Sequence, residues 1–163
     1  MSKIATLLVM AAACSALPSA CLASAKGSCS IGDKKLAVTD GTIYRNPRFG
    51  DKTDVPTIAL TDFKLDERVA KVDNPQAAIS AQRMDLGGGM VLFMLGADGV
   101  ILLNAMFADT GFSEGPSSGS IGELKLSRND ATGAAGHYTF AGKSEGEAVS
   151  CDLTFDLAYA KPR

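Results

Sequence analysis

Hydrophobic and polar positions alternate most regularly near the C-terminal end of the chain. Between Val149 and Tyr159, every second side chain is apolar or a cysteine, in the order Cys151, Leu153, Phe155 and Leu157. A period of two is the pattern of a strand that buries one face. We therefore expect a strand here, with Cys151 on its core-facing side.

Runs of β-prone residues separated by glycine, proline and aspartate predict further strands. They are Lys34–Thr39, Thr42–Arg45, Val55–Thr61, Met90–Leu95, Val100–Phe107, Gly122–Arg128 and Gly136–Phe140. The Asp-Gly pairs at 40–41 and 98–99 each predict a hairpin. The strands around the second pair are apolar throughout, which predicts burial on both faces and a central place in the fold.

Helical periodicity is confined to one part of the chain. Leu65, Val69 and Val72 share one face of a predicted helix over 65–72, which we expect to end before Pro75. The following segment, 76–86, is ambiguous and is interpreted as helix and then strand. Together these elements predict a mainly β domain: an antiparallel β-sandwich or flattened barrel of about eight strands with one short helix.

The first 25 residues have the pattern of a secretory signal peptide. A lysine precedes the apolar run Ile4–Ala13, and Ala23-Ser24-Ala25 fits a cleavage site. We therefore expect residues 26–163 to form a single domain that is periplasmic or secreted. An alternative is a lipid anchor at Cys21, although Pro18 departs from the pattern expected three residues before an acylated cysteine.

Removal of this leader leaves two cysteines, Cys29 and Cys151. Exported chains meet an oxidising environment, so the two thiols are predicted to form a disulfide between the first and last strands. Closing so long a loop is expected to contribute about 4–5 kcal/mol in the chain-entropy model. Two buried free thiols are the alternative.

Composition excludes several classes of function. The chain has a formal net charge of −2 and no basic run, which argues against nucleic-acid binding. No second apolar stretch is long enough to span a membrane. Tryptophan is absent and aromatic residues are few, so a carbohydrate-binding platform is not expected. Nothing in the sequence calls for a cofactor.

Two overlapping matches to the serine-hydrolase pattern G-x-S-x-G are centred on Ser113 and Ser117. The motif needs a sharp turn from strand into helix, whereas a strand is predicted to follow here. His137, the only histidine, is the sole candidate base, with Asp130, Asp152 or Asp156 as a partner. Because it alternates with core-facing neighbours, His137 is expected to face solvent on its strand.

No metal site is predicted. A single histidine together with oxidised cysteines does not provide the three or four nitrogen or sulfur ligands of a zinc site. The carboxylates of Asp62, Asp66 and Glu67 are interpreted as caps at a helix entrance. Calcium at these carboxylates remains an alternative, although the chain has no twelve-residue calcium-binding loop.

By elimination, the sequence predicts binding and not catalysis. Our first hypothesis is an exported bacterial envelope protein that binds a protein partner, as an inhibitor or immunity-type module. The Gly/Ser-rich segment 109–120 is the expected contact, with Phe112 as an apolar anchor beside Ser113 and Glu114. The alternatives are a small-ligand or lipid carrier with a cavity around Met90–Phe107, and a small serine hydrolase using Ser113 or Ser117 with His137.

Overall fold

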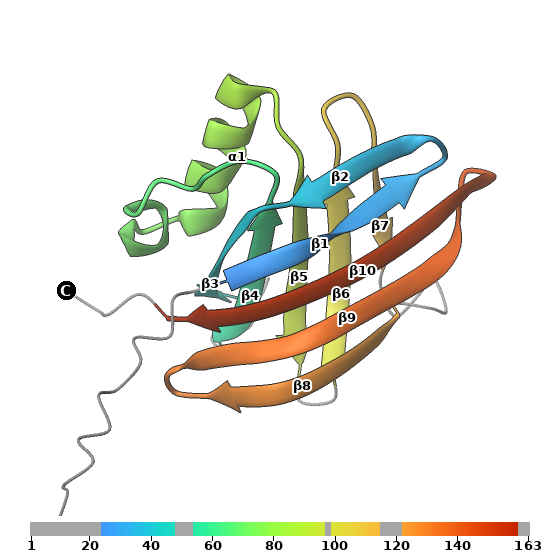
Figure 1. The fold of residues 1–163 in the computed structure, drawn as a ribbon. Coiled ribbons are helices and arrows are strands. Elements are labelled where there is room, and N and C mark those ends of the chain that lie inside the picture. Colours follow the sequence, from blue (N-terminus) through green and yellow to red (C-terminus); the bar gives the residue numbers. More distant parts are fainter. Residues whose placement is uncertain (1–23, 48–53, 97–98, 115–121, 160–163) are drawn as a thin grey trace, which may run out of the picture.

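The computed structural model describes residues 24–47, 54–96, 99–114 and 122–159, which form two antiparallel sheets of five strands each (Figure 1). Sheet A contains β1 (Ser24–Ile31), β2 (Lys34–Val38), β8 (Glu123–Asp130), β9 (Gly133–Ser144) and β10 (Glu147–Ala158). Sheet B contains β3 (Asp40–Pro47), β4 (Asp54–Thr61), β5 (Met90–Gly96), β6 (Gly99–Met106) and β7 (Gly111–Glu114). Their strand orders are β2-β1-β10-β9-β8 and β3-β4-β5-β6-β7.

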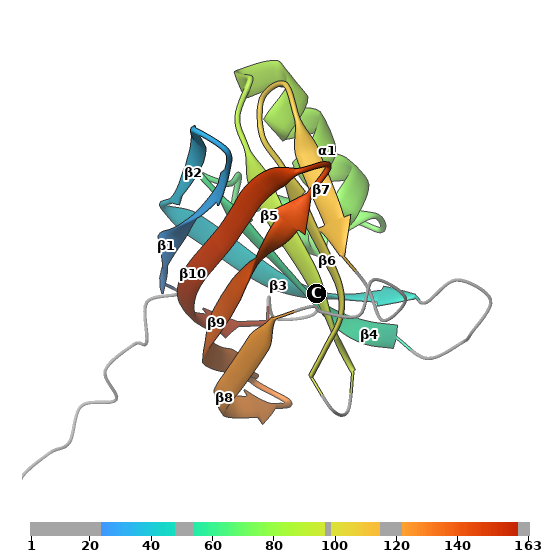
Figure 2. The same cartoon turned by 90° about the vertical axis from the view of Figure 1, so that its right-hand side faces the viewer.

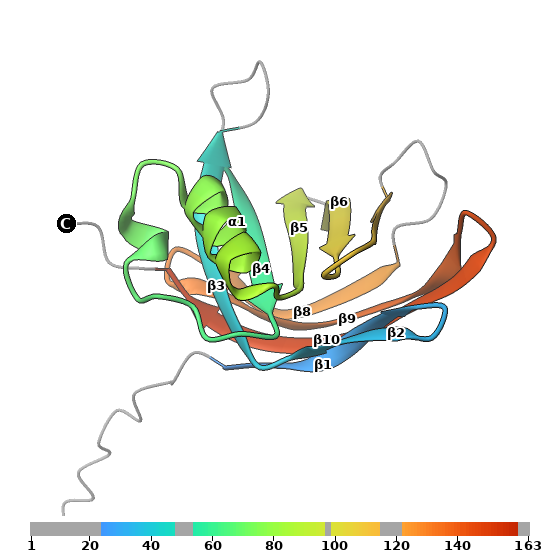
Figure 3. The ribbon, with the colours of Figure 1, turned by 90° about the horizontal axis from the view of Figure 1, so that it is seen from above.

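The two sheets stack as a sandwich, and a helix covers part of one outer face. Seen from above, the two sheets form two layers, and helix α1 (Pro75–Leu86) lies at the β3–β4 side of sheet B (Figure 3). The helix packs on the face of sheet B that points away from sheet A. The strands of one sheet run across those of the other, and the side view shows the same crossed arrangement (Figures 1 and 2). The predicted β-sandwich is confirmed, with ten strands in place of about eight.

The core between the sheets is aromatic at its centre. Phe93 on β5 stacks on Tyr138 of β9, with ring centroids 5.4 Å apart, and lies 5.6 Å from the ring of Phe155 on β10. All three side chains are buried, as are the other inward-facing residues of β10. The alternation in the last strand therefore correctly predicts which of its faces is buried.

A second apolar cluster lies between sheet B and helix α1. Ile79 of the helix packs with Met90 and Leu92 of β5 and with Tyr44 of β3. Strand β5 thus contributes side chains to both clusters and is buried on both faces. This confirms the central position predicted from its continuous apolar sequence.

The helix lies later in the chain than the periodicity indicates. Only Val69–Lys71 is helical in the predicted segment, as the 3₁₀ turn η1, and Val72 is 44% exposed. Eight residues do not offset the cost of helix nucleation. Helix α1 instead spans the ambiguous segment, because Asn74 caps its first turn through Ala77 N (3.0 Å), Pro75 begins it, and Gly87 ends it in the left-handed conformation.

The first Asp-Gly pair does not form a hairpin. Asp40 and Gly41 begin β3, and the chain passes there from sheet A into sheet B. Asp40 accepts hydrogen bonds from the backbone N–H groups of Gly41 (2.8 Å) and Leu65 (2.9 Å), which fixes this corner. A Cβ atom on Gly41 would lie 2.7 Å from Leu60 Cδ2, so glycine permits the close approach of β3 to β4.

The second Asp-Gly prediction is confirmed, since β5 and β6 pair as antiparallel neighbours across 97–98. The first hairpin of the fold is instead β1–β2, whose strands are joined at Gly32 and Asp33.

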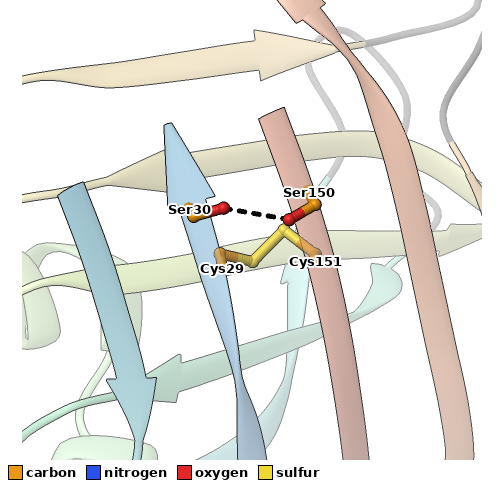
Figure 4. The surroundings of a disulfide bond; sticks show 4 residues. All are labelled: Cys29, Ser30, Ser150 and Cys151. Carbon is orange, nitrogen blue, oxygen red and sulfur yellow. Dashed lines mark hydrogen bonds between the residues drawn. A yellow bond between two sulfur atoms is a disulfide. The ribbon is translucent and has the colours of Figure 1, made fainter. Parts of the chain in front are cut away.

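The predicted disulfide joins Cys29 of β1 to Cys151 of β10, which face one another directly in the antiparallel register (Figure 4). Both side chains are buried in the core between the sheets. On the solvent side, in the adjacent pair of the register, the hydroxyls of Ser30 and Ser150 are hydrogen-bonded at 2.9 Å. The disulfide therefore links the neighbouring inner strands β1 and β10 of sheet A on the core side.

Candidate functional site

The structure places the candidate hydrolase residues in different sheets. Ser113 lies on β7 in sheet B, where it pairs with Asn104 of β6, and a strand rather than a strand-to-helix turn contains it. His137 lies on β9 in sheet A. Ser117 falls outside the described residues. The arrangement of a nucleophile on a sharp turn beside its base is therefore not formed by Ser113 and His137.

His137 faces solvent, as its alternation with buried neighbours predicts. Its Nε2 atom lies 2.7 Å from Oδ1 of Asp152 on β10, and the two side chains are 46% and 78% exposed. Lys125 and Thr154, the residues beside His137 in the strand register, belong to the same outer face of the sheet. The pair therefore lies on the solvent-facing side of sheet A.

Asp62 and Asp66 have structural partners, and the side chain that caps helix α1 is Asn74. Asp62 Oδ1 accepts a hydrogen bond from Gly89 N at 2.8 Å, so it joins the end of β4 to the start of β5. Asp66 accepts bonds from the backbone and guanidinium of Arg68, and these bonds lower the pKa of Asp66 to about 2. Across the described ranges, no three histidine, cysteine or acidic side chains are placed to hold a metal ion.

The segment predicted as an unpacked contact loop is partly a strand. Residues 111–114 form β7 and pair with β6, while 115–121 lie outside the described residues. Phe112 is only 5% exposed, and its ring stacks on Phe140 at a centroid distance of 5.9 Å. Phe112 is therefore part of the core and not an exposed anchor, because its strand position directs it between the sheets. Ser113 and Glu114 follow it on β7.

The turn before this strand contributes Phe107, Ala108 and Asp109 to a cleft where both sheets meet the helix. The cleft has a volume of about 450 Å³ and lies between β2, the end of α1 and the β6–β7 turn, which appears at the top of Figure 1. We call it the β2–α1 cleft. It is lined by Lys34, Lys35, Leu36, Asp62, Gly87, Gly89, Phe107, Ala108 and Asp109.

The cleft has an apolar floor and a charged rim. Leu36 and Phe107 line it with mostly buried side chains, whereas Lys35, Asp62 and Asp109 are exposed. Close packing shapes the floor: a Cβ atom on Gly89 would lie 2.5 Å from Leu36 Cδ1. Such an apolar centre surrounded by polar groups is the usual anatomy of a protein-binding surface.

Two further contacts hold the walls of this cleft together. Lys34 Nζ on β2 bonds Oδ2 of Asp109 at 2.6 Å, which links sheet A to the β6–β7 turn. Arg83 of α1 donates to the carbonyl oxygens of Gly88 and Phe107, each at 3.3 Å, and so links the helix to the same turn. Local sequence patterns do not predict this cleft, because its lining residues come from four separated segments.

The Lys34–Asp109 pair is expected to affect the pKa of the Asp109 carboxyl. The hydrogen bond from Lys34 lowers the pKa of Asp109 below its ordinary value of 3.8. In a carboxyl-detected NMR titration, Lys34→Met is expected to raise the midpoint of Asp109 toward that value. The neighbouring Lys35→Met variant should leave it unchanged.

Because the folded-state pKa of Asp109 is lowered, the pair stabilises the folded protein above the unfolded pKa. This contribution is lost as the pH falls through the folded value. The effect on unfolding should be small, since both side chains are well exposed. An Asp109 midpoint that does not respond to Lys34→Met would contradict the pairing.

Comparisons with protein-family models, with curated proteins and with solved structures find no match to this chain. Its class is therefore defined by the fold: a crossed two-sheet β-sandwich closed by a buried disulfide between its first and last strands. That bond is compatible with an oxidising, exported compartment. None of the helices in the described segments is long and apolar enough to cross a membrane.

Proposed function

We propose that this chain is a non-enzymatic, exported envelope protein that binds a protein partner through the β2–α1 cleft, as an inhibitor or immunity-type module. The observation that carries the proposal is the cleft itself, in which Leu36 and Phe107 form an apolar floor beneath charged residues. A volume of about 450 Å³ accommodates an anchoring side chain of a partner.

The charged residues around the cleft would favour a partner whose surface carries complementary charges. Lys35 on one side and Asp62 on another give the rim both signs within one opening. Charged groups of this kind contribute orientation and partner choice more than affinity. Within segment 109–120, we therefore assign the partner contact to Asp109, which lines the cleft. Phe112 belongs to the core and does not take part.

The two alternative functions receive less support. The space between the sheets around Phe93 is filled by the rings of Tyr138 and Phe155, which disfavours a ligand carrier that uses this interior. The hydrolase alternative requires Ser113 and His137 to meet, and they lie in different sheets. Protein binding remains the function that the described surface fits best.

Site-specific photo-crosslinking in cells that naturally export the protein tests this proposal. A photoreactive phenylalanine analogue replaces Ala108, which is exposed in the cleft, and in a control it replaces Ala141, which is exposed on the outer face of sheet A. We expect a discrete protein adduct from position 108 and at least tenfold less from position 141. Lys35→Glu should reduce the adduct at 108 without changing the unfolding midpoint.

Equal adducts from positions 108 and 141 would show that the contact is not specific to the cleft. The absence of any adduct at position 108 would remove the cleft as the partner surface.

A further inference from the structure

Strand β2 has an open edge beside the β2–α1 cleft. It stands at the end of the strand order β2-β1-β10-β9-β8, and among the described strands it pairs with β1 alone. Figure 1 shows it as the uppermost strand of sheet A, with helix α1 and the β6–β7 turn rising past it. An edge strand offers backbone N–H and C=O groups to which another chain can add a strand.

The register shows which peptide groups of β2 point to this open edge. Cys29 and Cys151 face each other with Cα atoms 4.0 Å apart, close to the roughly 4.5 Å of a pair that shares no backbone hydrogen bonds. The peptide groups of Cys29 therefore point to β2, where those of its partner Leu36 point back. Because these directions alternate along a strand, the N–H and C=O groups of Lys35 and Ala37 point to the open edge. Within the described part of the chain, no group bonds to them there.

The side chains at this edge are divided between its two faces. Leu36 is buried and forms part of the cleft floor with Phe107. Side chains directly opposite on neighbouring strands share one face of a sheet. In a strand added to β2, the residue opposite Leu36 would therefore point to the cleft, where an apolar side chain fits.

The outer face of the edge favours an acidic residue. Lys35 and Ala37 alternate with the buried Leu36, and both are exposed. The ammonium of the preceding Lys34 is paired with Asp109, whereas Lys35 forms no ion pair with any described residue. A carboxylate opposite Lys35 would complete a cross-strand pair of opposite charge, which stabilises neighbouring strands.

We propose that the open edge of β2 receives an extended segment of the partner protein as an additional antiparallel strand of sheet A. The segment has an apolar side chain opposite Leu36, which enters the cleft, and an acidic side chain opposite Lys35. This proposal rests on protein binding at the β2–α1 cleft and specifies how the partner binds. A single segment suits the site, because α1 and the β6–β7 turn rise past β2 and leave less room for a whole second sandwich (Figure 1).

Proline at position 37 tests the edge in cells with the natural partner. Proline lacks the N–H group but is tolerated on an edge strand where that group faces solvent. Ala37→Pro thus removes one bond to an added strand and leaves the pairing of β1 with β2 in place. With the photoreactive analogue at position 108, we expect Ala37→Pro to reduce the adduct at least tenfold. Ala37→Ser keeps the N–H group and should leave the adduct unchanged, with equal melting temperatures for both variants.

A peptide titration gives a second measurement on the unaltered, disulfide-bonded protein. The probe is the blocked heptapeptide Glu-Val-Glu-Phe-Glu-Val-Glu, observed through the amide signals of the protein by NMR. We expect saturable shifts at Lys35 and Ala37 and at least tenfold slower hydrogen exchange of these two amides. The same peptide with lysine in place of glutamate should bind at least fivefold more weakly.

N-methylated peptides separate strand addition from other contacts. N-methylation of the two glutamates beside the phenylalanine removes the N–H groups that would face β2, so binding should be lost. N-methylation of the phenylalanine removes an N–H group that would face solvent, so the affinity should change less than threefold.

Equal adducts at position 108 in Ala37→Pro and Ala37→Ser would overturn strand addition while leaving protein binding at the cleft in place. Equal binding of the two N-methylated peptides, or unchanged exchange of the Lys35 and Ala37 amides at millimolar peptide, would also overturn it. If position 108 gives no adduct in any variant, protein binding at the cleft fails and strand addition fails with it. An adduct formed by two copies of this chain would replace the assigned segment with a second copy.

Discussion

Replacing both half-cystines, as Cys29→Ala/Cys151→Ala, is expected to lower the free energy of unfolding by about 4 kcal/mol. The bond joins residues separated by 122 positions, so it restricts almost the whole described chain in the unfolded state. The double variant leaves no free thiol in the core, which keeps the comparison with the oxidised protein simple. Urea denaturation measured by circular dichroism provides the test.

A matched control lies one residue away on each of the same strands. Ser30→Ala/Ser150→Ala removes the solvent-side hydroxyl pair and should change the free energy of unfolding by no more than about 0.5 kcal/mol. If the cysteine variant lost less than about 1 kcal/mol, the disulfide would not be the main constraint on the unfolded chain.

Phe93→Ala is expected to have an effect of similar size, about 4 kcal/mol of lost stability. Phe93 is fully buried and contacts aromatic rings on two strands of the opposite sheet. Removing its ring leaves a cavity between the sheets, because the crossed strands around it are each fixed by their own sheet. The denaturation measurement used for the cysteine variant applies here.

Leu86→Ala serves as the control for Phe93→Ala. Leu86 is also a large apolar residue, but it is 59% exposed at the end of α1. Its truncation should change the free energy of unfolding by no more than about 0.5 kcal/mol. Similar losses for the two variants would show that the aromatic contacts between the sheets are not the centre of the core.

The sequence is most informative where a pattern reports burial directly. Alternation in the last strand identifies its buried face, on which Cys151 lies, and the continuous apolar run of β5 identifies a strand covered on both sides. Both predictions depend only on which side chains avoid water. Tertiary contacts rarely override the burial that such patterns predict.

Local turn and helix signals are less reliable here, because distant contacts decide their outcome. An Asp-Gly pair favours a hairpin turn, yet Asp40 accepts a hydrogen bond from Leu65 N, and Asp40 and Gly41 pair with strand β4. Segment 65–72 has apolar residues at helical spacing, yet the Asp66 side chain accepts a hydrogen bond from Arg68 N, and only a 3₁₀ turn forms. The caps at Asn74 and Gly87 define the helix that forms.

The candidate sites were not predictable from local sequence. The β2–α1 cleft combines segments near 35, 62, 88 and 108, which lie far apart in the sequence. The glycine- and serine-rich composition around Phe112 indicated an exposed loop, but the aromatic side chain itself favours burial. Its stacking on Phe140 depends on a strand in the other sheet.

The position of β1 has a consequence for how the chain acquires its fold. This strand lies between β2, its neighbour in sequence, and β10, the last strand of the described chain. Because the paired positions Cys29 and Cys151 are 122 residues apart, one edge of β1 stays unpaired until β10 is available. Sheet A is therefore completed by its most distant pairing, which predicts slow folding and a late, nearly simultaneous formation of the β1–β10 ladder and its disulfide.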